Sequence, residues 1–432
     1  MIDTLPSSIA RTIRSLPTRS LLVASALLAA CGGSSSGPTF YKDVQPILTA
    51  NCTGCHVAQG IAPFELTDYA SAQAHGQLIS AAVQAHTMPP WMPSSDTPAM
   101  VDMRVLTQAQ INTLVSWVST GMAEGNPADA TVAPTPTAFA ADATLQVPAP
   151  YTPDSSLGTD DYHCFVIDPQ LTADTAITGL NIEPGDRRVV HHVIVYAVDP
   201  SHLSDLQQLE AGGDGNGYTC FGSSNVDAAT TVGGWVPGTT ATEFPEGTGV
   251  VLTAGSQIIL QVHYNLLTVQ NTTDQTTAQF KYARAETVTP AYVFPILNNS
   301  FSIPPGAVQT VSQQFDTGDI DIPDGVRMQM WGVLPHMHLH GTDISVTGQM
   351  LDGSNQLFVH IPKWNFSWQE FYFFQEPIVI EKGDKVTLSC TFDNTQANQP
   401  VINGMQEIPQ TLTWGEDTLN EMCLNFFYGT LE

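Results

Sequence analysis

Three histidines lie close together in the stretch Leu334-Pro335-His336-Met337-His338-Leu339-His340-Gly341. On an extended strand, side chains two residues apart point to the same face, so His336 and His338 can hold one metal ion between them. A His-x-His pair also arises by chance, because surface and core histidines are common. The stretch therefore gains meaning only from metal-ligating residues elsewhere in the chain.

Further candidate ligands occur before and after this stretch: the pair His191-His192, the single His263, and Met422 near the end of the sequence. Combined with the His-x-His pair, they supply one set of three imidazoles and one set of two imidazoles and a thioether. Imidazole and thioether together suit copper. The sequence therefore predicts two copper sites, in two different parts of the chain.

The pair His191-His192 sets a condition on the backbone. It lies within an apolar run from Val189 to Tyr196, and neighbouring side chains on a regular strand point to opposite faces. Both imidazoles reach one ion only if the strand is locally bent or the pair lies at its end. The alternative is one buried and one exposed histidine.

Length and charge limit which class of protein this chain can belong to. A chain of 432 residues is expected to form about two to four domains. Charged residues make up only 12%, with 30 prolines and 33 glycines, which favours a β-rich exported protein. A formal net charge of -28 argues against nucleic-acid binding and against electrostatic attachment to anionic lipid.

The first residues read as a targeting segment. Three arginines precede an apolar run over 21–30, which ends in the small-residue pattern Leu28-Ala29-Ala30-Cys31. This resembles a bacterial lipoprotein signal over residues 1–31, with Cys31 as the lipidated residue, followed by a flexible tether over 32–39. An uncleaved membrane anchor is the alternative, but the run is too short to span a bilayer. We expect a lipid-anchored protein of the bacterial cell envelope, on the periplasmic side or on the outer-membrane or extracellular face.

Residues 40–128 read as a small helical domain that contains the motif Cys52-Thr53-Gly54-Cys55-His56. The spacing C-x-x-C-H is typical of covalent haem c attachment, in which Cys52 and Cys55 bind the porphyrin and His56 the iron. A redox-active C-x-x-C or half of a zinc site is the alternative, but neither accounts for the adjacent histidine. The segment resembles the cytochrome c family.

The second iron ligand is predicted to be Met88, in a proline-rich loop, where a thioether would raise the potential and suit electron transfer. Met92 and His86 compete with it, and either methionine could simply pack on the haem edge. Further along, a capping box formed by Thr107 and Gln110 predicts a final helix.

Residues 129–150 are rich in Ala, Thr and Pro and read as an interdomain linker. Beyond them, short apolar or alternating runs recur between turn signals, which predicts antiparallel β-sandwiches. The region is large for one sandwich, so we divide it into 151–298 and 299–432.

The seven cysteines sort into three uses: lipidation of Cys31, the C-x-x-C pair, and four others. In an exported protein, those four suggest two disulfides. Sequence order favours Cys164 with Cys220 and Cys390 with Cys423, which keeps each bridge inside one predicted domain. Four cysteines allow three connectivities, so the other two pairings stay open.

The order of the metal-ligating motifs over 151–432 resembles that of the copper type II, ascorbate-dependent monooxygenase family, which includes the peptidylglycine and dopamine hydroxylases. That order is His-His on a strand, His-Tyr after an apolar strand, His-x-His followed by a glycine, and Glu-Met-Cys near the end. The residues here are, in order, His191-His192, His263-Tyr264, His336-Met337-His338 with Gly341, and Glu421-Met422-Cys423.

The resemblance implies two jelly-roll domains, so that the expected fold class is a small all-α cytochrome c domain followed by two all-β jelly-roll sandwiches. It implies an electron-transfer copper held by His191, His192 and His263. It also implies a catalytic copper held by His336, His338 and Met422, where O2 binds and a substrate C–H bond is hydroxylated. His340 is interpreted as a histidine that supports the ligands or lies at the surface.

One position departs from the family. Its peptide hydroxylases carry an arginine for the substrate carboxylate two residues before the His-x-His pair, where this chain has Leu334. The expected function is therefore an exported copper monooxygenase of another small organic substrate, with electrons supplied through the fused haem from an unknown donor. The alternative is a haem and copper electron-transfer or copper-binding lipoprotein without oxygenase activity.

Overall fold

The computed structural model describes residues 37–58, 62–130, 139–236, 239, 241–267, 269, 271–319, 323, 325–366, 368–402 and 404–432. The expected signal peptide with Cys31, and most of the tether over 32–39, lie outside the described residues. So do residues 131–138 of the expected linker. Residues 38–432 form one compact unit.

The predicted fold class is wrong. The structure is mostly β, with 39% of residues in strands and 17% in helices, and the residues that it describes show no sign of a cytochrome c helical domain. The helices before residue 120 are short: α1 Gln45–Asn51, α2 Tyr69–Ala74, α3 Gly76–Gln84 and α4 Gln108–Ser119. Part of the same segment packs into a β core, so this segment is not an independent helical domain.

Local sequence signals still set the helix ends. The side chain of Thr107 accepts from the amide of Gln110, and the Gln110 side chain accepts from the amide of Thr107, which forms the predicted capping box of α4. The buried face of α4 carries Ile111, Leu114 and Trp117. These residues recur at helical spacing and pack against Phe40 in a small core.

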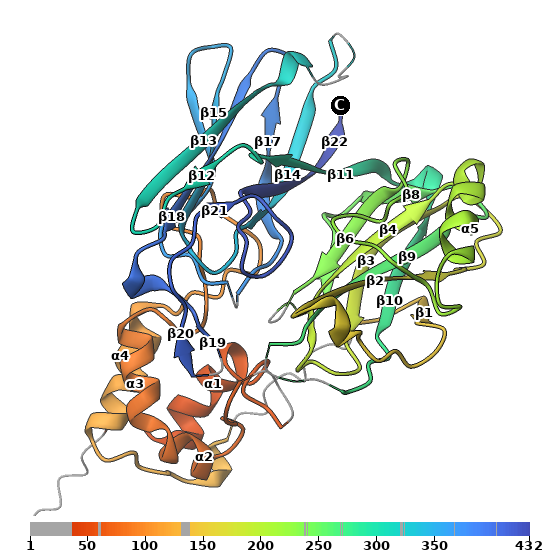
Figure 1. Ribbon diagram of the computed structural model, residues 1–432. Helices are drawn as coiled ribbons and strands as arrows, with labels where there is room; N and C mark the ends of the chain where they lie inside the picture. The colour runs from red at the N-terminus through yellow and green to blue at the C-terminus, as the bar shows by residue number, and fades with distance from the viewer. Residues whose placement is uncertain are drawn as a thin grey trace, which may run out of the picture. The chain divides into compact units, whose positions relative to one another are not determined.

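The first group of strands forms a sandwich (Figure 1, yellow to green). One sheet has the order β5-β2-β9-β4-β6, and the facing strands are β1, β10, β3 and β8, with β7 beside β3. The bounds are β1 Ala143–Gln146, β2 Asp160–Ile167, β3 Thr175–Glu183, β4 Val190–Val198, β5 Tyr218–Thr219, β6 Thr230–Trp235, β7 Thr242–Glu243, β8 Thr248–Leu252, β9 Gln257–Asn265 and β10 Thr277–Arg284. Buried side chains of both layers share one core, and helix α5 Leu203–Ala211 lies outside it.

The second group also forms a sandwich, with the sheet β13-β18-β15-β16 facing β11-β22-β14-β17. The bounds are β11 Thr289–Leu297, β12 Ser302–Ile303, β13 Val308–Asp316, β14 Met328–His336, β15 Gly341–Gln349, β16 Asn355–Ile361, β17 Tyr372–Ile380, β18 Lys385–Asp393, β19 Val401–Ile402, β20 Met405–Gln406, β21 Leu412–Thr413 and β22 Leu424–Leu431. The alternation of side chains along strand β18 explains why the two sheets pack face to face. Val386, Leu388 and Phe392 point into the core, and the polar residues between them point outward.

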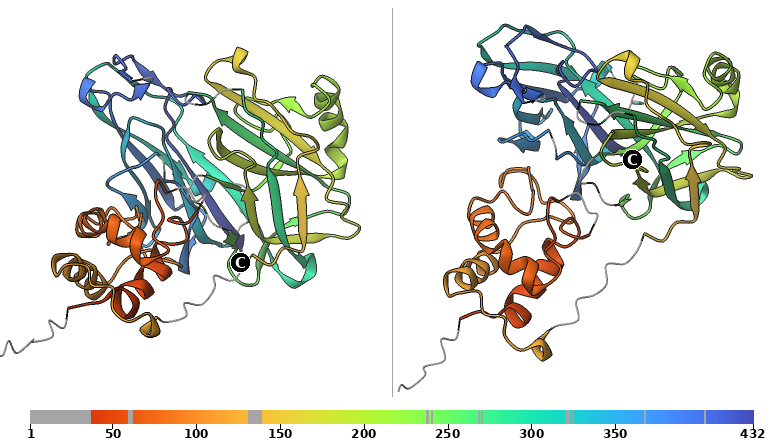
Figure 2. Two further views of the ribbon diagram at one scale, coloured as in Figure 1. Left: turned by 90° about the horizontal axis from the view of Figure 1, so that it is seen from below. Right: turned by 60° about the horizontal axis from the view of Figure 1, so that its bottom comes forward.

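The two sandwiches share a continuous sheet, because β8 pairs with β11 in parallel and β11 pairs with β22. Figure 2 shows the same strands from two further sides. Strand β11 pairs with β22 up to Leu297, so its residues lie in the sheet of the second sandwich although they precede residue 298. The domain boundary near 298 stays a prediction.

A segment from the N-terminal part, residues 91–101, packs on the second sandwich, and we call it the strap. Its Met100 is buried in the core of the second sandwich and forms a bridge to Phe374 on β17. The amide of Val101 donates to the carbonyl of Phe373 at 2.8 Å, and the amide of Ser94 donates to the carbonyl of His360. The strap thus extends the edge of β17.

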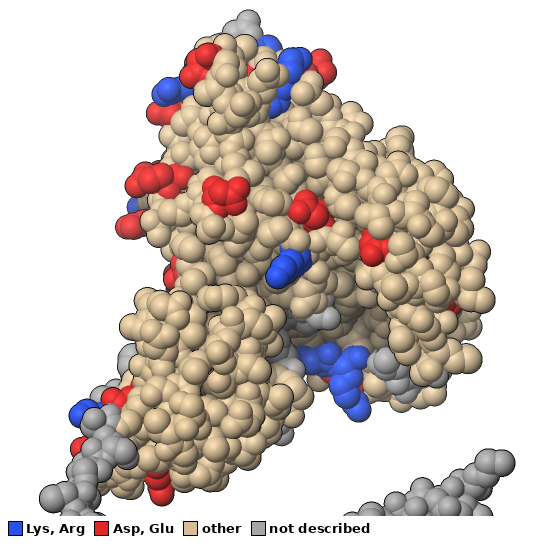
Figure 3. All heavy atoms as spheres, turned by 90° about the vertical axis from the view of Figure 1, so that its left-hand side faces the viewer, with Lys and Arg blue, Asp and Glu red and all other residues tan. Residues whose placement is uncertain are grey.

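Charged side chains are scattered on the face shown in Figure 3, between large areas that carry none. This agrees with the low content of charged residues. Within the part of the chain that the structure describes, no helix combines the length and apolar character needed to cross a bilayer.

Removing the Met100 side chain tests whether the strap belongs to the sandwich core. Met100 is 1% exposed, so Met100→Ala should lower the free energy of unfolding by about 2–4 kcal/mol, as for other buried methionines. Val101→Ala, at a side chain 47% exposed, is the control and should change it by less than about 0.5 kcal/mol. Urea unfolding followed by fluorescence gives both values, and equal small effects would mean that the strap is not part of the core.

Candidate metal centre

Three imidazoles converge at one end of the first sandwich. The Nδ1 atom of His191 lies 3.3 Å from the Nδ1 atoms of His192 and His263, and the last two are 3.4 Å apart. Imidazole nitrogens bind an ion such as Zn²⁺ at about 2.0–2.1 Å, so three ligands at tetrahedral angles lie about 3.3–3.4 Å from one another. The triangle therefore has the size that one first-row transition-metal ion requires.

A β-bulge allows the two neighbouring histidines to join this triangle. Strand β4 pairs with β9 in a register that shifts between Val190 and His192, so His191 has no direct partner on β9. A bulged residue turns its side chain away from the regular alternation. This bulge is the local bend that both imidazoles need in order to reach one ion. His192 lies directly opposite His263 on β9.

Asp160 orients the third imidazole. Its Oδ1 accepts from Nε2 of His263 at 2.8 Å and from the hydroxyl of Thr418 at 2.7 Å. Because the Nε2 hydrogen goes to the carboxylate, Nδ1 of His263 keeps a lone pair directed at the triangle. The ring of Tyr162 stacks on that of His263 at 4.1 Å and limits its rotation.

The surroundings of four of these histidines disfavour the charged form. Burial, followed by the nearby histidines, lowers the pKa values of His191 and His192 well below the usual range. Burial also lowers the pKa of His336 to about 4 and that of His338 well below its usual value. Neutral imidazole is the form that binds metals, so all four are ready as ligands at neutral pH.

The His-x-His pair lies at the end of a strand, not along one. Strand β14 ends at His336, whose Nδ1 contacts Oε1 of Gln369 at 2.5 Å. Nδ1 of His338 lies 3.1 Å from the carbonyl of Asn420. The two rings are 5.0 Å apart, and with both Nδ1 atoms engaged, the Nε2 atoms are left for a metal.

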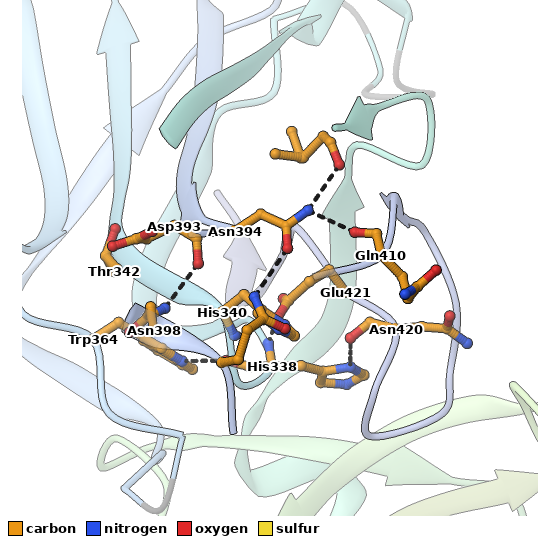
Figure 4. Close-up of polar contacts among 12 residues, drawn as sticks. His338, His340, Thr342, Trp364, Asp393, Asn394, Asn398, Gln410, Asn420 and Glu421 are labelled. Carbon is orange, nitrogen blue, oxygen red and sulfur yellow. Dashed lines mark hydrogen bonds and ion pairs between the residues drawn. The ribbon is translucent and has the colours of Figure 1, made fainter. Parts of the chain in front are cut away.

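Glu421 supports the backbone where the strand pairing stops (Figure 4). Its buried carboxylate accepts from the amides of His338 at 2.9 Å and of His340 at 2.6 Å. Nδ1 of His340 lies 3.2 Å from the same carboxylate, and its Nε2 lies 3.3 Å from Oε1 of Gln399. Both nitrogens of His340 are therefore engaged, which fits a histidine that supports the ligands.

Met422 follows Glu421 and precedes a disulfide cysteine. The bridge joins Cys423 to Cys390 on β18, and a second one joins Cys164 on β2 to Cys220 after β5. These are the pairings that sequence order favours. Met422 is buried and, like His336, lines one cavity, whereas His338 is not among the residues that line it.

The loop between β16 and β17 connects the two histidine sets. Phe366 stacks on His191 at 4.6 Å and meets the edge of His338 at 5.9 Å. The indole of Trp364 donates to the carbonyl of His338, and Gln369 contacts His336. The rings of His192 and His336 are 6.5 Å apart, so the two sets are near neighbours.

A cavity of about 330 Å³ opens beside both sets. His192 from the first set and His336 with Met422 from the second line it. Most of the remaining wall is apolar, with Trp235 and Phe371 among the aromatic side chains. The cavity therefore gives a small molecule access to ligands of both candidate centres.

The C-x-x-C-H residues lie directly after α1. Nδ1 of His56 is 2.9 Å from the carbonyl of Phe64, which leaves its Nε2 available as a ligand. Cys52 and Cys55 are free thiols, and burial raises both pKa values, that of Cys52 to about 12. Met88 is 44% exposed in the loop after α3.

Sequence reasoning missed the residues that hold the ligands, namely Asp160, Phe366 and Gln369. Asp160 begins β2, and its register opposite the end of β9 brings it to His263. The other two lie in a loop without regular structure. Their only signal in the sequence is their place before a strand, which does not distinguish them from ordinary polar and aromatic residues.

Comparison with known proteins supports the copper assignment. Residues 293–429 match the profile of the copper type II ascorbate-dependent monooxygenase C-terminal domain. The DBH-like monooxygenase protein 2 of Mus musculus is 25% identical over 257 residues, which cover 56% of this chain and 38% of that relative. The chain thus spans less than half the length of this relative. Both findings support the copper type II monooxygenase family and an oxidoreductase.

Two solved structures show a weak similarity to this chain. A subviral particle of the infectious bursal disease virus protein VP2 shows 10% identity, with 66% of this chain and 70% of that chain covered and a TM-score of 0.18. Allantoicase shows 14% identity, with coverages of 59% and 78% and the same TM-score.

Replacing the carboxylate of Asp160 by an amide should weaken copper binding at the three-histidine set. Asp160→Asn removes the charged acceptor of His263, and losses of such supporting partners cost about 10–100-fold in metal affinity. Asp205→Asn, at a side chain 64% exposed, serves as the control and should bind copper like the wild type. Competition titration with a chelator measures both, and unchanged affinity in Asp160→Asn would contradict the assigned role.

Proposed function

We propose that this chain is a copper-dependent monooxygenase that uses O2 to hydroxylate a C–H bond of a small organic molecule. The observation that carries the proposal is the triangle of Nδ1 atoms from His191, His192 and His263, next to a cavity lined by His336 and Met422. The family match over the C-terminal domain supports the same chemistry.

The two residue sets fit two copper ions of different roles. His191, His192 and His263 would hold one ion, and three neutral imidazoles can serve both oxidation states. His336, His338 and Met422 would hold the other. Bound copper supplies one-electron redox chemistry and activation of O2, and a thioether favours the Cu(I) state that must meet O2.

The protein's own contribution is to orient these ligands and to exclude water. Asp160 and Gln369 each engage one ring nitrogen of a histidine, which directs the other nitrogen to the metal. The apolar wall of the cavity keeps competing water away from the reacting C–H bond. Phe366 keeps the two sets close, which shortens the path that an electron must cover.

We also propose that Cys52, Cys55 and His56 carry a covalently attached haem that supplies electrons to the copper centres. The spacing of the two cysteines and the adjacent histidine, directly after α1, supports this use. The contact of His56 with Phe64 fixes its ring as in other metal-binding histidines. Met88 is the proposed second iron ligand, with Met92 and His86 as competitors.

Export and lipid anchoring belong to the same proposal. The apolar run before Cys31 motivates them. A lipid on Cys31 would hold the protein at the bacterial cell envelope, where a donor to the haem and an oxidising environment for the two disulfides would both be found.

Removing one imidazole of the triangle tests the proposed function. His263→Ala should lower the copper content from two equivalents to about one and reduce O2-dependent product formation by at least ~100-fold, since loss of a supporting partner alone costs up to that much. Copper analysis, with O2 uptake and product detection under ascorbate, measures both.

The surface variant His202→Ala, 44% exposed, is the control and should match the wild type. Two bound copper ions in the wild type without any oxygenated product, across a screen of small molecules, would point to an electron-transfer or copper-binding protein instead.

The haem proposal has its own test. Replacing Cys52 and Cys55 together by Ala should abolish covalently bound haem, since both thioether links are lost. Thr53→Ala, between the two cysteines, should retain it. Absorbance of the pyridine haemochrome after acid extraction measures covalent haem, and its absence from wild type purified from a haem-attaching host would overturn this part.

A further inference from the structure

A short segment, Phe366 with residues 368–370, contacts ligands of both candidate copper centres, and we call it the clasp. Its Phe366 ring stacks on His191 at 4.6 Å. The amide nitrogen of Gln369 donates to the carbonyl of Phe366 at 2.8 Å, so the amide oxygen is the atom that meets Nδ1 of His336 at 2.5 Å. The orientation of the His336 ring therefore depends on where the clasp holds Gln369.

The clasp lies between strands β16 and β17, outside regular structure. Its side chains must therefore be fixed by contacts with other parts of the chain. Arg104 provides two such contacts, an ion pair with Glu370 and a position over the ring of Trp368 at 5.0 Å. These two residues directly precede and follow Gln369. Arg104 thus holds the clasp on both sides of the residue that contacts His336.

The two partners of the ion pair differ in their access to water. The side chain of Glu370 is 11% exposed, whereas that of Arg104 is 28% exposed. Burial raises the pKa of Glu370, and the charge of Arg104 acts against this effect. A buried carboxylate that loses its cation is strongly unfavourable. Without Arg104, Glu370 would have to turn toward water, and the adjacent Gln369 would move with it.

We propose that Arg104 is a positioning residue for the second set of copper ligands. It acts through Glu370 and Gln369, which carry its effect to the ring of His336. Arg104 follows the strap in the N-terminal part of the chain, so this part serves the copper centre as well as the fold. The inference rests on the proposed function for the presence of copper at the second set.

Arg104→Met tests this role, because it removes the charge and keeps an unbranched aliphatic side chain. The full chain is used in a His263→Ala background, so that copper binds at the second set alone. The affinity for Cu(II), from competition with a chelator, should fall about 10-fold, as for other residues that support a ligand. The electron paramagnetic resonance spectrum of the bound Cu(II) should change as well, because the His336 ring is reoriented.

Two further variants in the same background separate positioning from a general loss of stability. Arg327→Met breaks the ion pair with Glu432, whose side chains are 49% and 48% exposed, and should leave affinity and spectrum unchanged. Arg104→Met combined with Glu370→Gln leaves no unpaired carboxylate and should restore both. Circular dichroism checks that every variant is folded.

An Arg104→Met protein with the affinity and spectrum of its parent would overturn the inference. An equal change in Arg327→Met would do the same, since the effect would then not be specific to the clasp. A loss that the double variant does not recover would reject the route through Glu370. If the His263→Ala parent binds no copper, the proposed function fails and the inference fails with it, whereas an unaffected Arg104→Met protein overturns the inference alone.

Discussion

The convergence of three imidazole nitrogens is the constraint on which the rest of the site depends. His263 gives its Nε2 hydrogen to Asp160, so its Nδ1 presents a lone pair to the Nδ1 atoms of His191 and His192 only 3.3 to 3.4 Å away. Ring nitrogens that point their lone pairs at one another repel, and a shared cation would remove that repulsion. The bulge in β4, the stacked ring of Tyr162 and the carboxylate of Asp160 all serve to hold it.

The second set is built by different means. Strand β14 stops at His336, and Glu421 takes over the amides that a neighbouring strand would otherwise pair. One residue later, Met422 faces the cavity, and the disulfide of Cys423 fixes the end of the segment to β18. The loop that carries Phe366 then touches histidines of both sets, so a shift in this loop would affect both together.

Much of the site can be predicted from the sequence, because ligand-type residues recur there in a set order. The need for a bend at His191-His192 also follows from strand geometry, but its form as a bulge depends on the register with β9. The contacts of Asp160 and Gln369 with the ligands depend on pairings between distant segments. The fold class was wrong for a related reason. The early helices are short, and Met100 packs into the second sandwich beside strand β17, which lies far along the chain.

The ion pair of Arg104 with Glu370 has a consequence for how the chain could be divided or recombined. Glu370 lines the cavity, yet its counter-charge comes from the segment that follows the strap. Cutting the chain between the early helices and the sandwiches would leave a buried acid uncompensated and the edge of β17 bare. The two regions are therefore not interchangeable modules, and transplanting the sandwiches alone would alter the wall of the cavity.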